Sequence, residues 1–147
     1  MPLYSLAFSN RSFKDFYSRE NILLAVGSYM QQQNQITILR MNDPCGISKD
    51  FQISESYPAT KIMFLPRIEE GFEEDRDLLA TSSDILRLYS IGRTSNGLFS
   101  LVQDPVELRN NSEYCQPISS FDWNKYDKNI IATASIDSSV TIWDIQQ

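Results

Sequence analysis

The 147-residue sequence contains no histidine. This absence excludes Ser–His–Asp and Cys–His nucleophile pairs, zinc sites that use imidazole, and a histidine pH switch. The 5 glycines form no GxGxxG or GxxxxGK[ST] string, so a phosphate-binding loop is not expected. Cys45 and Cys115 stand far apart without a C-x-x-C pair, which leaves two free thiols or a single disulfide as the interpretations. We therefore expect no enzyme active site, no metal site and no cofactor.

Positive charge and long apolar runs are also scarce. Lys and Arg number 13 against 19 Asp and Glu, which gives a net charge of -6. That balance argues against a broad basic surface for direct contact with nucleic acid or anionic lipid. No apolar run approaches the roughly 18 residues of a membrane span, and the longest, residues 22–26, fits a buried strand. We expect neither nucleic acid nor membrane as a direct partner.

The sequence lacks a sustained helical stripe but contains a threefold repeat. Each unit opens on a segment that ends in an aromatic residue, namely Phe8, Phe64 and Trp123. A second segment carries alanine and then small hydroxyl residues, at 23–28, 78–83 and 130–135. A third alternates with period two, at 36–39, 86–89 and 141–144, as a strand requires. Weaker extended segments at 50–54 and 98–102 complete the first two units, so the sequence predicts an all-β chain.

Four short strands per unit, small hydroxyl residues after the second strand, and Trp143-Asp144 at the end of a third strand resemble the WD40 repeat of β-propellers. In the first two units Leu39-Arg40 and Tyr89-Ser90 replace the Trp-Asp pair. Longer strings at 58–63, 77–84, 86–89 and 115–124 resemble one group more closely. This group comprises the plant transparent-testa-glabra proteins and their animal relative, the cullin-4-associated WD-repeat factor that scaffolds dual-specificity kinases.

The resemblance implies a seven-bladed ring, of which this chain has room for about three blades at about 40–45 residues each. We expect a partial WD40 propeller, an open arc with units at residues 3–54, 58–102 and 117–147, the last without its final strand. Two blade flanks would then face solvent unless self-association through the open edges, another partner or further sequence covers them.

The resemblance also implies structural roles for several residues. Asp84 and Asp137 fall in the turn after the second strand, where a short carboxylate can accept hydrogen bonds from backbone amides. Without histidine, the WD40 network of Asp, His, Ser/Thr and Trp is expected to be incomplete. Trp143 is expected in the core with Asp144 at a strand end. The two would also begin the W-D-x-R box that docks onto the cullin-4 adaptor, but Gln146 replaces its arginine.

Two insertions separate the predicted strands. Residues 67–77 hold six acids and two bases, and the run predicts a solvated loop or, alternatively, a site for a basic partner segment. Residues 104–116 precede the third unit and predict either an ordinary loop or a partner-binding loop. The candidate contact residues in this second loop are polar or aromatic: Arg109, Asn110, Asn111, Glu113 and Tyr114.

Family membership would imply binding rather than catalysis. The leading hypothesis is a noncatalytic scaffold for protein kinases or transcription regulators in cytoplasm and nucleus. The alternatives are a substrate receptor of a cullin-4 ubiquitin ligase and a truncated family member with little independent function.

Overall fold

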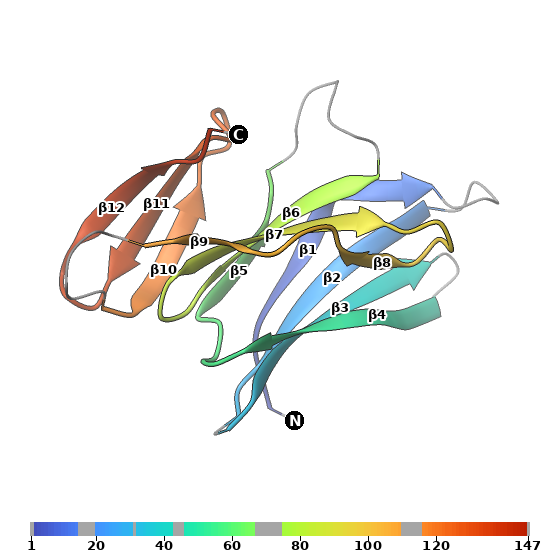
Figure 1. The fold of residues 1–147 in the computed structure, drawn as a ribbon, viewed down its shortest axis with the longest axis horizontal. Helices are drawn as coiled ribbons and strands as arrows, with labels where there is room; N and C mark the ends of the chain where they lie inside the picture. Colours follow the sequence, from blue (N-terminus) through green and yellow to red (C-terminus); the bar gives the residue numbers. More distant parts are fainter. Residues whose placement is uncertain are drawn as a thin grey trace.

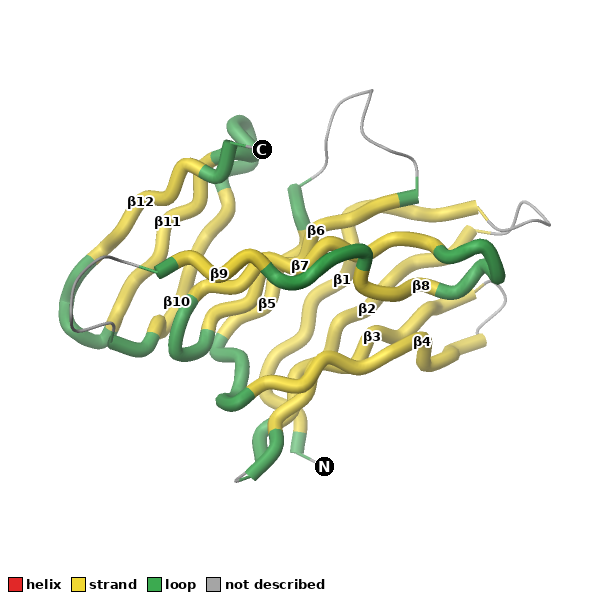
Figure 2. The backbone as a smooth tube through the Cα atoms, in the orientation of Figure 1, coloured by secondary structure: helices red, strands yellow, loops and turns green. Residues whose placement is uncertain are grey.

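The computed structural model describes residues 2–14, 20–30, 32–42, 46–66, 75–109 and 116–146. Throughout these residues the regular elements are β-strands, which form three antiparallel sheets (Figure 1). The backbone tube in Figure 2 shows strands and loops in this part of the chain and no helix. Accordingly, the described residues include no helix that could span a membrane. The prediction of an all-β chain is confirmed.

The first sheet contains four strands in chain order. These are β1 (Leu3–Lys14), β2 (Glu20–Ser28), β3 (Asn34–Asn42) and β4 (Gly46–Glu55). Strand β1 continues well past the predicted apolar segment through a register shift between Phe8 and Ser12. Polar residues extend the strand because ladder pairing uses the backbone, which does not depend on apolar side chains.

The second sheet has one more strand than the repeat predicts. It contains β5 (Lys61–Phe64), β6 (Arg76–Ser82), β7 (Leu86–Arg93), β8 (Phe99–Leu101) and β9 (Val106–Leu108). Strand β8 pairs with residues 91–93 of β7, whereas β9 pairs with residues 86–88. The predicted loop at 104–116 therefore begins with a strand, and this sheet extends beyond residue 102. Three residues are too few to show a period of two, which is why sequence analysis missed β9.

The third sheet contains β10 (Ile118–Trp123), β11 (Ile130–Ser135) and β12 (Val140–Asp144) in that order. Its strands coincide with the three segments predicted for the third unit. The first strands of the sheets lie together, because β5 contacts both β1 and β10 (Figure 1). This arrangement places the middle sheet between the other two.

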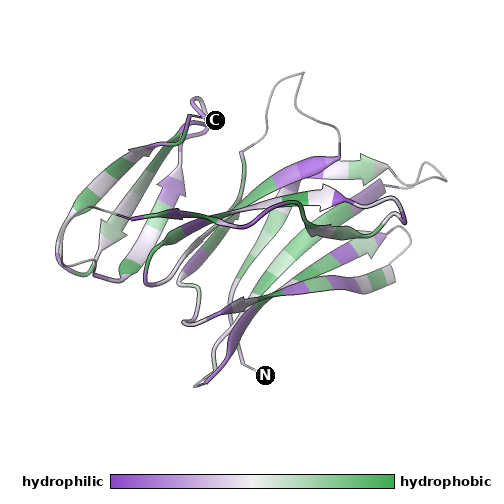
Figure 3. Cartoon of the chain, viewed as in Figure 1, coloured by the Kyte–Doolittle hydropathy of each residue, from purple (hydrophilic) through white to green (hydrophobic). Residues whose placement is uncertain are grey.

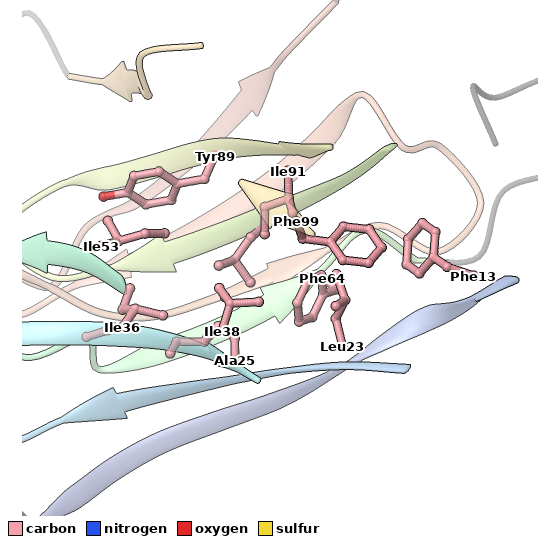
Figure 4. Packing of buried hydrophobic residues seen from close by; sticks show 13 residues of the cluster. Phe13, Leu23, Ala25, Ile36, Ile38, Ile53, Phe64, Tyr89, Ile91 and Phe99 are labelled. Atoms are coloured by element: carbon pink, nitrogen blue, oxygen red, sulfur yellow. The ribbon is translucent and has the colours of Figure 1, made fainter. Parts of the chain in front are cut away.

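Two hydrophobic cores hold the sheets face to face. Figure 4 shows the core between the first two sheets. In this core the rings of Phe13 and Phe99 meet edge to face, with their centroids 4.8 Å apart. The second core joins the second and third sheets around Trp123. Neighbouring residues of β6 serve different cores: Leu79 faces the first sheet, whereas Leu78 packs toward the third. Because both faces of the middle sheet are covered, β6 is buried from its second residue onward.

The repeat aromatics have unequal burial although they occupy equivalent strands. Phe64 and Trp123 are 1% and 0% exposed, and each packs against the preceding sheet. Phe8 is 54% exposed and lies beside other exposed apolar side chains of the first sheet, including Leu6 and Ile22. The hydropathy colouring in Figure 3 shows apolar bands alternating with polar ones along these strands. Burial of the repeat aromatic is thus decided by the neighbouring sheet and not by the strand itself.

Candidate functional site

A pocket of about 580 Å³, called here the tyrosine pocket, opens where the turns and links of the three sheets meet. Tyr29 follows β2, Tyr57 lies between β4 and β5, and Asp84 lies in the turn between β6 and β7. The pocket is lined by three tyrosines, two prolines, two hydroxyl residues and one acid: Tyr4, Tyr29, Tyr57, Pro58, Thr60, Ser83, Asp84 and Pro117. Sequence analysis singled out only Asp84 among them, because the others are scattered along the chain without a common motif.

The tyrosine rings are available to a ligand. Each of the three is more than half exposed. The rings of Tyr4 and Tyr29 are tilted by 51° with centroids 5.4 Å apart. The amide of Tyr29 donates to the carbonyl of Pro2 at 3.0 Å, which fastens the turn after β2 to the start of β1. This bond keeps the two residues close together, and both side chains remain exposed.

Thr60 fixes the wall of the pocket where the second and third sheets meet. Its hydroxyl lies 2.9 Å from the carbonyl oxygen of Ile118 and 2.7 Å from the hydroxyl of Ser82. The amide of Ile118 in turn donates to the carbonyl of Ser83 at 2.8 Å. These bonds join β10 to the link before β5 and to the β6–β7 turn, so the second and third sheets are connected beside the pocket.

Among the described lining residues, Asp84 is the charged one. Its carboxylate accepts hydrogen bonds from the Ser83 hydroxyl at 2.8 Å and from the Arg87 guanidinium at 2.7 Å. Partial burial by itself raises the pKa of Asp84, but the bonds from Arg87 and Ser83 outweigh burial and hold the pKa below its ordinary value. Asp84 is therefore ionised at neutral pH, and its side chain remains 33% exposed.

Behind the pocket, Arg87 connects three carboxylates from different elements. Besides Asp84, it reaches Glu55 at the end of β4 at 3.4 Å and Glu107 in β9 at 3.2 Å. The Tyr89 hydroxyl donates to Glu55. Burial raises the pKa of Glu55, although the hydrogen bond from Tyr89 and the charge of Arg87 oppose this shift. Burial also raises the pKa of Tyr89, and the hydrogen bond to Glu55 adds to that shift. The second sheet thus has a buried polar network although the sequence offers no histidine.

The two predicted structural residues of the third sheet lie in different surroundings. Asp137 is exposed in the β11–β12 turn, where its carboxylate accepts the amide of Ser139 at 2.8 Å. Hydrogen bonds from Ser139 lower the pKa of Asp137. The Trp143 indole packs against the second core and donates to the Thr133 hydroxyl at 2.9 Å. Asp144 ends β12 and accepts the amide of Gln146 at 3.2 Å.

Of the predicted partner-binding loop, the structure describes residues 104–109 and 116. Arg109 is exposed and bonds to Glu107 at 2.8 Å, which places it beside the Arg87 network. Four candidate residues of this loop lie outside the described residues: Asn110, Asn111, Glu113 and Tyr114. Cys45 and Cys115 also lie outside them. In the described part of the chain, the Asp and Glu side chains form no group of three that could hold a metal ion.

The prediction of a solvated acidic loop at 67–77 is wrong at its end. Residues 67–74 lie outside the described residues, and Asp75 is exposed, but Asp77 belongs to β6 and is 1% exposed. Its carboxylate accepts hydrogen bonds from the Ser9 hydroxyl and from the amide of Leu78, the latter at 2.9 Å. The acidic run predicts a loop for the whole segment, because charge alone does not reveal that Asp77 lies near the start of a buried strand.

Replacing Trp143 by phenylalanine tests the bond in the third sheet. The change removes the indole N–H that donates to the Thr133 hydroxyl but keeps an aromatic ring, so loss of this hydrogen bond should lower the free energy of unfolding by about 1 kcal/mol. Urea unfolding measures the effect. Thr133→Val serves as the second arm of a double-mutant cycle, and fully additive losses would show that the bond does not stabilise the fold.

No protein-family model matches the sequence. Over 151 residues the chain is 34% identical to the "DDB1- and CUL4-associated factor 7 homolog" of Dictyostelium discoideum, covering 98% of this chain and 41% of that protein. It is 27% identical over 138 residues to a WD repeat-containing protein of Saccharomyces cerevisiae. This match covers 84% of the chain and 25% of the yeast protein. A WD repeat-containing protein of Schizosaccharomyces pombe is 34% identical over 91 residues. That match covers 60% of the chain and 20% of the pombe protein.

These relatives, together with three antiparallel sheets packed face to face in an open arrangement, support a WD40-repeat protein whose described part forms partial propeller blades. The chain spans less than half the length of each of these relatives.

Proposed function

We propose that the chain is a noncatalytic interaction adaptor that belongs to the transparent-testa-glabra and cullin-4-associated WD-repeat group. Its partners would be protein kinases or transcription regulators, and its locations cytoplasm and nucleus. The observation that carries the proposal is the tyrosine pocket, with three exposed rings held at the ends of rigid sheets. Loops on a rigid scaffold are common binding sites, and tyrosine is enriched among the residues that dominate interface affinity.

The size of the pocket also favours a protein partner. A volume of about 580 Å³ accommodates one or two side chains, and the pocket draws residues from all three sheets. A partner side chain that binds there would lose water to the lining residues. The adaptor's own loops would lose little conformational entropy on binding. Low ordering cost lets a small contact contribute measurable affinity.

Binding of a purified dual-specificity kinase tests the proposal. We expect Tyr29→Ala and Tyr57→Ala each to weaken binding by about tenfold, since a lost aromatic anchor costs about 1–2 kcal/mol. Surface plasmon resonance with the immobilised chain measures the dissociation constants. Tyr126→Ala is the matched control, because Tyr126 is fully exposed on the β10–β11 connection. Equal affinity for all three variants would remove the tyrosine pocket from the proposal.

A second candidate function is substrate receptor of a cullin-4 ubiquitin ligase. One relative is named for association with DDB1 and CUL4, and Trp143-Asp144 matches the start of the docking box. The Trp143 indole is already bonded to Thr133, and Gln146 replaces the arginine. Purified DDB1 discriminates the two candidates. Binding that strengthens in Gln146→Arg would support the receptor, whereas no binding by either form would exclude it.

A further inference from the structure

We propose that the tyrosine pocket recognises a cationic side chain, arginine or lysine, on an extended segment of the partner protein. This inference rests on the proposed function, because it names the chemistry of the partner at the same site. It is carried by two properties of the lining, the arrangement of its rings and the sign of its charge.

The rings provide one attraction for a cation. An aromatic face carries partial negative charge, so an ammonium or guanidinium group within about 6 Å of a ring centroid is attracted to it. Tyr4 and Tyr29 are tilted rather than stacked flat, so their faces are not consumed by each other. Tyr57 joins the lining from a third position. Pro58 and Pro117 offer apolar walls for the aliphatic stem of lysine or arginine.

The charge provides a second attraction. Asp84 is ionised, and no cationic residue belongs to the described lining. Arg87 binds the two Asp84 oxygens unequally, at 2.7 and 3.3 Å, and a carboxylate can accept further hydrogen bonds. Arg87 does not reverse the sign, because it also faces Glu55 and Glu107. Even with Arg109 counted beside Glu107, three acids oppose two bases in this network.

The complementarity of charge selects one class of occupant. An acidic or phosphorylated segment would meet Asp84 and the negative ring faces, and a neutral segment would gain only apolar contact. A cation gains both the electrostatic contact with Asp84 and the cation–π contact. The net charge of -6 on the whole chain would also favour encounter with a basic segment.

The test compares two peptides that differ at one residue. The probes are a fluorescently labelled Ser-Pro-Arg-Pro-Ser pentapeptide and the same peptide with glutamine in place of arginine; the prolines keep both extended. Fluorescence anisotropy with the full chain should give at least about fivefold tighter binding of the arginine peptide. A lysine version should bind like the arginine peptide. Added NaCl should weaken this preference, because it screens the exposed charges.

Variants of the chain locate the binding. Tyr29→Ala and Tyr57→Ala should each weaken the arginine peptide by about fivefold, and Tyr126→Ala should leave it unchanged. Asp84→Asn should reduce the preference for arginine over glutamine. Asp84 also bonds to Arg87, so circular dichroism must first show that the Asp84→Asn variant is folded. If it is not folded, the tyrosine variants alone test whether the peptide binds in the tyrosine pocket.

The outcomes separate this inference from the proposed function. Equal binding of the arginine and glutamine peptides, no binding of either at millimolar concentration, or unchanged binding in the tyrosine variants would overturn it. Kinase binding that depends on Tyr29 would leave the adaptor proposal standing in each of those cases. Conversely, selective arginine binding without binding of any kinase would support the pocket chemistry and count against the kinase partner.

Discussion

Replacing Arg87 by methionine is expected to lower the free energy of unfolding by about 3 kcal/mol. The methionine fills a similar space but leaves Glu55 without its cation, and the Glu55 side chain is 3% exposed. An unpaired buried carboxylate is costly because neither water nor a counter-charge stabilises it. The Glu55–Arg87 contact also joins the end of the first sheet to the second. Urea unfolding followed by tryptophan fluorescence measures the loss.

Arg109→Met is the matched control for this experiment. Arg109 bonds to Glu107 in the same network, but its side chain is 58% exposed. Exposed ion pairs contribute about 0–1 kcal/mol, so this change should have a small effect. Equal losses for the two variants would contradict a special role for Arg87. A Glu55→Gln, Arg87→Met double variant should recover part of the stability, because it removes the unpaired charge.

Replacing Asp77 by asparagine is expected to stabilise the protein at neutral pH by about 2 kcal/mol. Burial raises the pKa of Asp77 from 3.8 to about 6, against the opposing effects of the Ser9 and Leu78 hydrogen bonds and of Arg11. The folded state thus holds this proton more tightly than the unfolded state. Its contribution to stability falls as pH rises from about 4 to about 6, and the full cost of the buried carboxylate remains at higher pH.

The pH dependence distinguishes this explanation from simple repacking. Urea unfolding should be measured between pH 4 and 7.5. The free energy of unfolding of the variant, relative to the parent, should increase up to about pH 6 and then stay constant. Asp75→Asn is the control, because it makes the same chemical change in a side chain that is 64% exposed. A stability difference that is the same at pH 4 and pH 7.5 would show that Asp77 is not the titrating group.

Both predictions concern polar groups that lie between sheets. Arg87 links carboxylates of the first and second sheets, and Asp77 in the second sheet accepts the Ser9 hydroxyl of the first. Their expected effects have opposite signs because Arg87→Met removes the cation that faces a buried carboxylate at 3.4 Å, whereas Asp77→Asn removes the buried carboxylate itself. The same contacts hold the sheets on which the tyrosine pocket is built.

The sequence by itself determined the strands whose side chains carry the pattern. The alanine-containing segments became β2, β6 and β11, and the alternating segments became β3, β7 and β12. Apolar side chains recurring with period two can be read locally, because successive strand residues point to opposite faces. The aromatic-ended segments at Phe8, Phe64 and Trp123 marked β1, β5 and β10, although β1 continues past Phe8 to Lys14. Fold class followed from these local signals.

Only the tertiary structure decided which of these side chains are buried and which polar groups meet. Phe8 and Phe64 share a repeat position, yet only Phe64 has a preceding sheet against it. Asp77 reads as part of an acidic run and is buried because β1 lies beside it. The tyrosine pocket joins residues from 4 to 117, brought together by the ends of three sheets. Burial and proximity of this kind depend on how sheets stack, and no local pattern in the chain encodes them.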